Sequence, residues 1–352
     1  MEAAKLERDA KPLRVAVVGA GAFGRNHLRV YRELQQADAL VELAAVVDPN
    51  EAARTAASAK YGIPGFASID ECLVACKLDA ASLCVPTVHH AECARTLLTS
   101  GVDLLVEKPI AASLAEADEI VRLARDLGRA VQVGHLERFN PAVRVARGLL
   151  NHPMFFEVHR LSVFTPRSLD VDVVLDLMIH DLDIVLRLAG APLRELRAVG
   201  LPVLSPRVDI ANVRLEFENG CVANLTASRV STERVRKMRL FQPHQYLSLD
   251  FARRDLLLID VSAAVGLDPA QLAALATAAA ASGQLAPGMS LRKVPVEPDE
   301  PLRLEIESFL NAVRRRAQPE VTAEDGRAAL ALALQINAAI AAHAQRTGLS
   351  LR

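Results

Sequence analysis

Two residues at helical spacing in the middle of the chain could act together in proton transfer. They are Asp176 and His180, in the segment Asp176-Leu-Met-Ile-His180-Asp-Leu-Asp183. Positions i and i+4 lie on one face of a helix, so both side chains would point the same way. A carboxylate beside an imidazole sets the orientation and proton affinity of the ring, as a proton acceptor requires. A surface ion pair is the alternative. A metal site is a further one, although one Asp/His pair supplies too few ligands.

Lys108 lies in a second candidate motif, Glu107-Lys108-Pro109, at the carboxyl end of a strand expected to begin near Val102. The strands of a parallel sheet end at one edge, where the ligands of open α/β sheets bind. A lysine there can hydrogen-bond a substrate hydroxyl, and partial burial favours the neutral form that accepts a proton. An ion pair between Lys108 and Glu107 on a loop explains the same residues equally well.

The third motif is Gly19-Ala20-Gly21-Ala22-Phe23-Gly24, between an apolar strand and a helix. Such glycines allow a tight turn and a close approach of the backbone to a pyrophosphate, and the helix N-terminus supplies amide donors. Asp48 ends the next strand, where an acid can bind the ribose hydroxyls of a dinucleotide. It would repel a 2′-phosphate, which favours NAD over NADP. Alternatively, Asp48 only caps the turn Asp48-Pro49-Asn50.

The elements that must position these motifs follow two different patterns along the chain. Between Leu13 and Gly134, apolar β-branched runs alternate with helical stretches, with the strands expected at residues 13–19, 41–48, 81–86, 102–109 and 130–134. Near-continuous apolar strands separated by helices are typical of a parallel sheet covered on both faces. The sequence therefore predicts an α/β fold in which residues 1–134 form a doubly wound, NAD-binding Rossmann domain.

After Gly134 the pattern predicts a second, α+β domain over residues 135–352. A helix from about Asn140, a strand at 155–163 and a helix at 173–188 precede several successive strands, which implies an antiparallel or mixed sheet. Residues 212–229 alternate apolar and polar side chains around Asn219-Gly220, a strong hairpin signal. The Ala-rich segment 262–288 is expected to be an insertion in that sheet. Two helices, near 304–315 and 323–343, are expected to close the chain.

Composition limits the class of protein. The 352 residues include 41 Lys plus Arg against 42 Asp plus Glu, and 51% are hydrophobic. Interspersed charges with a net of -1 argue against nucleic acid binding. The first fourteen residues contain no apolar block, so no signal peptide is predicted. Five cysteines without paired CxxC spacing indicate reduced thiols. We therefore expect a cytoplasmic protein that binds neither nucleic acid, membrane nor metal.

Together, the glycine motif, Asp48, Glu107-Lys108-Pro109 and the Asp176/His180 pair resemble the Gfo/Idh/MocA family of oxidoreductases. The resemblance implies a Rossmann domain, a second domain whose large open, mostly antiparallel sheet serves as substrate wall and oligomer interface, and oxidation of a sugar secondary alcohol by hydride transfer to NAD. It implies that Lys108 and His180 are the catalytic pair, supported by Asp176, in a homo-oligomer (dimer or tetramer). The residues expected to bind the cofactor are Gly19, Gly21, Ala22, Phe23, Gly24, Asp48, Pro86, His89, Glu107 and Lys108.

Within the family, the segments 134–141 and 176–183 look like the branch that contains UDP-N-acetylglucosamine 3-dehydrogenases. That branch makes 3-keto sugar nucleotides for later amination, including for lipid A. The substrate would then contact Lys108, His135, Arg138, Asn140 and His180. The alternative is that Arg138 and Asn140 are ordinary residues at a helix N-terminus and that His135 is a core residue.

Other functions stay open. One is a dehydrogenase of a free polyol such as inositol, with the same catalytic residues. Another is a non-catalytic NAD-binding sensor, although the retention of both Lys108 and His180 counts against it. An NAD-dependent glycosidase is more remote. The histidines outside the motifs are expected to be packing or surface residues: His27, His152, His159, His244 and His343.

Overall fold

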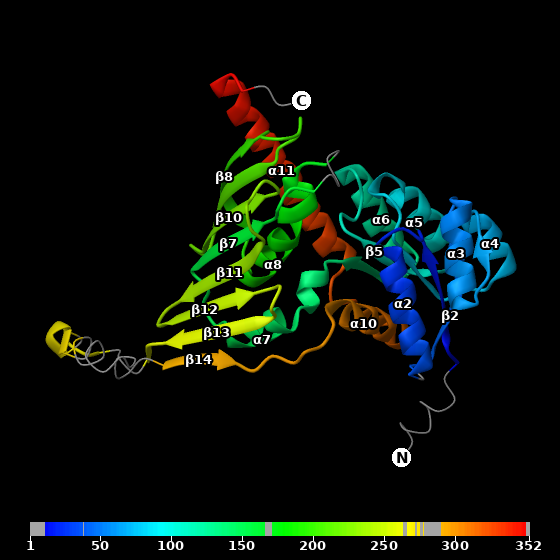
Figure 1. Ribbon diagram of the computed structural model, residues 1–352, viewed down its shortest axis with the longest axis horizontal. Helices are drawn as coiled ribbons and strands as arrows, with labels where there is room; N and C mark the ends of the chain where they lie inside the picture. Colours follow the sequence, from blue (N-terminus) through cyan, green and yellow to red (C-terminus); the bar gives the residue numbers. More distant parts are fainter. Residues whose placement is uncertain are drawn as a thin grey trace, which may run out of the picture. The chain divides into compact units, whose positions relative to one another are not determined.

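The computed structural model describes residues 11–37, 39–165, 171–262, 266–271, 273–274, 277 and 290–349 (Figure 1). The chain divides into two compact units. The first runs to Leu136 and takes in Glu300–Ala331. The second runs from Glu137 to Asp299 and continues from Leu332 onward.

The first unit is built on a six-stranded parallel sheet with the strand order β3-β2-β1-β4-β5-β6. The order reverses direction between β1 and β4, as in dinucleotide-binding folds, and so confirms the predicted Rossmann architecture. The strands are β1 (Leu13–Val18), β2 (Val41–Val47), β3 (Gly65–Phe66), β4 (Ala80–Leu83), β5 (Asp103–Glu107) and β6 (Val131–Gly134).

Helices cover both faces of this sheet, and side-chain caps define where several of them begin. They are α2 (Gly24–Gln36), α3 (Glu51–Tyr61), α4 (Ile69–Ala75), α5 (His90–Thr99), which follows a short 3-10 turn at Thr87–His89, and α6 (Leu114–Asp126). Asn50 and Ser68 cap α3 and α4, and Ser113 with Glu116 forms a reciprocal capping box at α6. These caps satisfy amide groups that would otherwise have no partner at a helix start.

The two compact units divide the chain differently from the predicted domains at the C-terminal side. The start of the second unit lies within two residues of the expected position, but Glu300–Ala331 belongs to the first unit. The reason is the apolar face of α10 (Pro301–Arg315), whose Ile306, Phe309 and Val313 share one buried core with Tyr31 and other residues of α2 and β1. A helix settles where its apolar face is covered, whatever its place in the sequence.

The second unit has an eight-stranded sheet with the order β14-β13-β12-β11-β7-β10-β9-β8. Every neighbouring pair is antiparallel except β7 and β10, so the predicted mostly antiparallel open sheet is confirmed. The predicted hairpin at Asn219-Gly220 joins β9 to β10. The strands are β7 (Phe155–Leu161), β8 (Leu193–Leu201), β9 (Ile210–Phe217), β10 (Val222–Ser228), β11 (Val235–Gln242), β12 (Gln245–Asp250), β13 (Asp255–Asp260) and β14 (Ser290–Val294).

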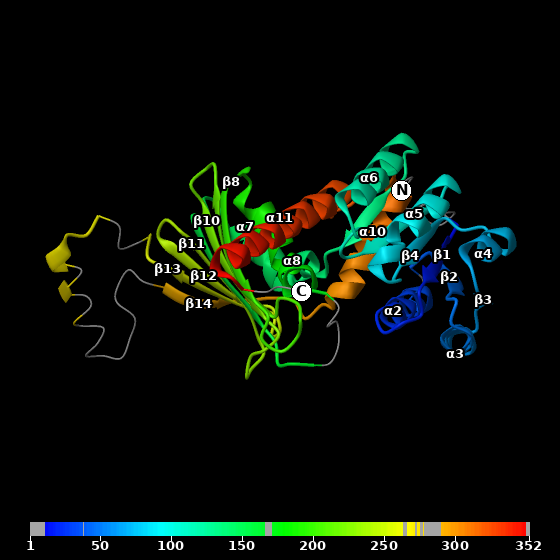
Figure 2. The same ribbon diagram turned by 90° about the horizontal axis from the view of Figure 1, so that it is seen from above.

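Alternate residues of β7, β9 and β10 are buried, so one face of this sheet is covered. The helices α7 (Pro141–Leu149) and α8 (Ile179–Ala189) lie on that face (Figure 2). The Ala-rich segment indeed connects two adjacent strands, β13 and β14, but most of it lies outside the described residues.

The last helix, α11 (Ala323–Thr347), begins in the first unit and continues into the second. Its length and mean hydropathy of 1.3 would allow it to cross a bilayer. However, its buried residues Leu332, Ile336, Ile340 and Ala344 recur every four positions, which is the pattern of a helix packed along one face. We interpret α11 as a core helix.

Candidate active site

The glycine motif forms a turn that only glycine can make at two of its positions. Gly19 has a φ of +98°, and a Cβ there would lie 2.6 Å from the carbonyl oxygen of Cys84. A Cβ on Gly24 would lie 1.8 Å from the carbonyl oxygen of Gly19. By contrast, no described atom lies within 4 Å of a Cβ built on Gly21, which leaves this backbone open to a ligand. The loop therefore fits the approach of a pyrophosphate to the start of α2.

Asp48 braces this loop from the end of β2. One carboxylate oxygen accepts a hydrogen bond from the backbone N–H of Ala20 at 2.7 Å, and the other accepts one from Asn50 at 2.8 Å. The structure thus includes the turn-capping role that the sequence left as the alternative. The two roles are compatible, because a carboxylate has more acceptor sites than these two bonds use.

A cavity of about 560 Å³ lies over this edge of the sheet. Five of the residues predicted to bind the cofactor line it: Gly19, Gly21, Asp48, Pro86 and His89. The others, Ala22, Phe23, Gly24, Glu107 and Lys108, are not among its lining residues. The charged residues in its wall are acidic, Asp48, Asp70 and Glu92, and its described lining residues include no lysine or arginine. The wall therefore suits the ribose hydroxyls of NAD and opposes a 2′-phosphate.

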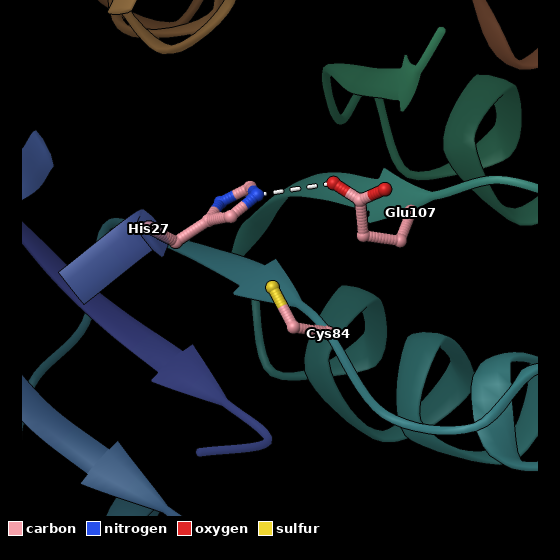
Figure 3. Close-up of side chains that lie close together, drawn as sticks. All are labelled: His27, Cys84 and Glu107. Atoms are coloured by element: carbon pink, nitrogen blue, oxygen red, sulfur yellow. Dashed lines mark hydrogen bonds and ion pairs between the residues drawn. The ribbon is translucent and has the colours of Figure 1, made fainter. Parts of the chain in front are cut away.

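Glu107 has a buried partner that was not predicted. Its carboxylate is paired with the ring Nε2 of His27, 3.0 Å from Oε1 (Figure 3). The carboxylate also lies over the end of β6, because a Cβ on Gly134 would be 2.8 Å from Oε1. His27 is fully buried, as expected of a packing residue, but its ring also has a carboxylate partner, which was not predicted.

The thiol of Cys84 completes this group, and the potential ligand atoms of Cys84, His27 and Glu107 lie within 4.8 Å of one another (Figure 3). Tetrahedral zinc with bonds of 2.0–2.3 Å would need its ligand atoms about 3.3–3.8 Å apart. The one contact of this group with a defined distance, His27 Nε2 to Glu107 Oε1 at 3.0 Å, is that of a hydrogen bond. Burial and the nearby carboxyl groups of Glu107 and Glu305 raise the pKa of the Cys84 thiol well above its usual range, which keeps it protonated.

Glu305, on α10, is a buried acid next to this group. Its side chain is fully buried, and neither carboxyl oxygen has a hydrogen-bond partner among the described residues. Burial, with a contribution from Glu107, raises the pKa of Glu305 well above its usual range. Burial therefore favours the protonated, neutral form of this carboxyl group, since an isolated charge at such a position would be far more costly.

Lys108 follows Glu107, and the Lys108–Pro109 peptide bond is cis. Beside it, the buried ring of His90 bridges two loops. Its Nδ1 lies 3.0 Å from the carbonyl oxygen of Pro109, and its Nε2 lies 3.0 Å from that of Val85. Sequence reasoning missed His90 and selected its neighbour His89.

In the second unit, Asp176 lies in a π turn (Val174–Met178) and not in the plain α-helix that was predicted. The N–H of Ile179, where α8 begins, donates to the carbonyl oxygen of Val174, five residues back. π turns within helices are frequent at functional sites. The turn is anchored by Asp172, whose carboxylate accepts hydrogen bonds from the N–H of Val174 and from Asn337 Nδ2, both at 2.9 Å.

Two buried ion pairs hold α8, which carries His180. Arg138 binds Asp183 through Nε at 2.7 Å and Nη2 at 2.8 Å. Arg160, on β7, binds Asp181 in the same two-pronged way at 2.7 and 2.8 Å. Such paired contacts fix geometry as well as charge. The segment around Arg138 and the helix of His180 are thus one structural unit, although 45 residues separate Arg138 from Asp183 in the sequence.

The residues predicted to bind the sugar nucleotide fall in different places. His135 is buried just after β6 in the first unit, whereas Arg138 and Asn140 belong to the second. Asn140 caps α7 by accepting from the N–H of Ala142 at 3.1 Å, and its Nδ2 donates to the carbonyl oxygen of Phe251. Asn140 thus has the helix-capping role that was the alternative, whereas Arg138 pairs with Asp183. Their role toward a substrate stays a prediction.

Comparison with known proteins agrees with this architecture. Residues 13–135 match the profile of the oxidoreductase family with an NAD-binding Rossmann fold, GFO_IDH_MocA, and residues 142–242 match a GFO/IDH/MocA C-terminal domain. The chain is 35% identical to a UDP-N-acetylglucosamine 3-dehydrogenase of Acidithiobacillus ferrooxidans, over 95% of this chain and 99% of that one. A solved structure of that enzyme superposes with a TM-score of 0.83 at 34% identity, with the same coverage.

An inositol 2-dehydrogenase of Leifsonia xyli is 31% identical over 51% of this chain and 54% of its own length. Three findings agree: a match that spans both units, a Rossmann sheet with its glycine loop, and an open second sheet. The chain belongs to the Gfo/Idh/MocA family of NAD-binding oxidoreductases.

Proposed function

We propose that this protein is an NAD-dependent dehydrogenase that oxidises the C3 hydroxyl of UDP-N-acetylglucosamine, or of a closely related UDP-sugar, to the 3-keto sugar nucleotide. The observation that carries the proposal is the 35% identity, over nearly the full length of both chains, to an enzyme with that activity. The acid-lined cavity beside the glycine loop supports NAD as the oxidant.

The chemistry divides between the cofactor and the chain. When bound, NAD supplies the acceptor for the hydride that leaves C3. Lys108 or His180 takes the proton from the hydroxyl oxygen while C3 loses the hydride, so the secondary alcohol becomes a ketone. Asp176 orients the proton acceptor. General base catalysis of this kind contributes about 100- to 10,000-fold to the rate.

The test follows NADH absorbance with purified protein and four substrates: UDP-N-acetylglucosamine, UDP-glucose, UDP-N-acetylglucosaminuronate and inositol. We expect turnover with UDP-N-acetylglucosamine, and turnover with inositol alone would overturn the nucleotide-sugar assignment. Lys108→Ala and His180→Ala should each lower kcat by at least 100-fold while NAD binding persists. The exposed residues Lys77 and His152 provide matched alanine controls. Turnover within a few-fold of wild type in either active-site variant would remove that residue from the mechanism.

The second candidate is a dehydrogenase of a free polyol, which the partial match to inositol 2-dehydrogenases favours. The same assay separates the two. A non-catalytic NAD-binding sensor would bind NAD and oxidise none of the four substrates.

The wider setting of the enzyme is also a proposal. A cytoplasmic homo-oligomer, dimer or tetramer, that binds neither nucleic acid nor membrane would assemble through the open face of the second sheet. Its product would be aminated for lipid A carrying 2,3-diamino sugars. Light scattering of the purified protein tests the oligomer, and a monomer at micromolar concentration would contradict it.

A further inference from the structure

The two residues on either side of Lys108 are each held by a buried histidine. His27 is bonded to the side chain of Glu107, and His90 lies at hydrogen-bond distance from the backbone carbonyl of Pro109. We propose that His27 and His90 are positioning residues that fix Lys108 for proton transfer. This inference rests on the proposed function, in which Lys108 meets the substrate hydroxyl.

On the N-terminal side of Lys108, the contact between His27 and Glu107 joins α2 to the end of β5. The ring of His27 is fully buried, and the side chain of Glu107 is only 13% exposed. A buried carboxylate without a partner costs about 1–3 kcal/mol or more, so Glu107 is held where the ring can reach it. The ring of Phe23 packs 5.3 Å from that of His27, centre to centre, and Gly134 leaves room for the carboxylate. The backbone entering Lys108 is thereby fixed.

On the C-terminal side, His90 joins the loop after β5 to the loop after β4. Both of its ring partners, Pro109 and Val85, offer carbonyl oxygens, which only accept hydrogen bonds. A neutral imidazole donates through one nitrogen and a charged one through both. Only the charged ring, 1% exposed at the first residue of α5, donates to both carbonyls and so ties the backbone leaving Lys108 to the loop after β4. The neutral ring donates to one of the two and packs against the other.

The contacts of His90 also connect the part of the site that binds NAD to the part that removes the proton. Val85 and its neighbour Pro86 line the cofactor cavity, so His90 links the wall of that cavity to the loop of Lys108. Reacting groups must approach to about 3–3.5 Å, and a displacement of about 1 Å can lower a rate 100-fold. Loss of either histidine should therefore affect the chemical step more than the binding of NAD.

The first arm of the test separates kcat from binding. His27→Phe and His90→Phe keep an aromatic ring in each site and remove its hydrogen bonds, whereas His27→Gln retains an amide that can donate to Glu107. We expect kcat to fall about 10- to 100-fold in both Phe variants, and the Kd for NAD to change less than about 3-fold. His27→Gln should recover most of the loss. The exposed His152→Phe should behave as wild type.

The second arm needs no turnover, and so separates this proposal from the proposed function. An amine-reactive acylating reagent is added to each apoprotein, and the labelling rates of Lys108 and of exposed Lys77 are measured by mass spectrometry. We expect the Lys108 rate to change at least 3-fold in the two Phe variants and to return toward wild type in His27→Gln, with the Lys77 rate constant. Unchanged Lys108 labelling, or a kcat loss matched by an equal loss of NAD affinity, would overturn the positioning role. Wild-type protein that oxidises no sugar would overturn the proposed function alone.

Discussion

Replacement of Glu305 by Gln should change how the stability of the protein depends on pH. In the unfolded chain a glutamic acid titrates near pH 4.3. In the folded protein the carboxyl group is fully buried, and burial, with a contribution from Glu107, raises its pKa well above that value. Between the two pKa values the folded state holds one proton more than the unfolded state.

The magnitude follows from proton linkage. The free energy of unfolding changes with pH by 2.303RT times the protons bound in the unfolded state minus those bound in the folded state, which is about -1.4 kcal/mol per pH unit here. The contribution of Glu305 is fully present below about pH 4.3 and is lost as the pH rises through the folded pKa. Glutamine does not ionise. Below the folded pKa, the variant should therefore gain on wild type by about 1.4 kcal/mol for each unit by which the pH rises.

Urea unfolding followed by far-ultraviolet circular dichroism at pH 5, 6 and 7 measures this difference. The exposed Glu297→Gln, which removes an acid from the surface, is the matched control and should run parallel to wild type. The free energies of unfolding of variant and wild type can also differ by an amount that is the same at every pH. That constant difference reflects the burial of the amide and does not change the pH dependence. Parallel curves for Glu305→Gln and wild type would refute the reasoning, because they would mean that Glu305 titrates alike in the folded and unfolded chains.

Three further substitutions test other contacts. Asp48→Ala should weaken binding of NAD much more than of NADP in a fluorescence titration, because the carboxylate favours ribose hydroxyls; equal losses would contradict that role. Arg138→Met leaves the Asp183 carboxylate buried without its ion pair and should lower the free energy of unfolding by about 3–5 kcal/mol, whereas adding Asp183→Leu should restore part of it. No recovery in the double variant would argue against the pair. Gly134→Ala places a Cβ 2.8 Å from Glu107 Oε1 and should lower kcat as His27→Phe does; wild-type kcat would show that Glu107 can move freely.

The parts of the fold that the sequence predicted were those set by local pattern. Apolar runs ending at Val18, Val47 and Glu107 are strands because each is buried on both faces, and that pattern is visible without knowing the partners. The hairpin at Asn219-Gly220 is equally local, because Gly220 accepts a φ of +83°. The glycine loop and Asp48 belong to the same class, since they lie at ends of predicted strands.

What the sequence could not predict depends on partners distant in the chain. The apolar face of α10 fits a helix in either unit, and only the packing of Phe309 in the core of the first unit decides between them. No residue type within the π turn around Asp176 distinguishes it from an α-helix. The sequence indicates only where a helical segment begins, through the capping residue Asp172 two positions before the turn.

Histidines were the hardest residues to assign, for a physical reason. His27 and His90 are both fully or almost fully buried. The residue type alone does not show whether a buried histidine only packs in the core or also binds a partner. What distinguishes these two is a partner at a strand end, Glu107 for one and Pro109 for the other. Gly134 was the available clue, since a glycine closing a strand next to a carboxylate marks space that a side chain must leave free.

The residues proposed to react and the residues proposed to hold them therefore follow different rules. Lys108 stands out by type and place, because a lysine at the carboxyl edge of a parallel sheet has a known chemical use. His27, His90 and Arg138 act through buried polar contacts, which are costly unless every partner is in place and so permit few arrangements. Such contacts make a site rigid. A variant that keeps Lys108 but loses one of its buried neighbours should accordingly bind NAD and turn over slowly, and that combination would distinguish a misplaced lysine from a missing one.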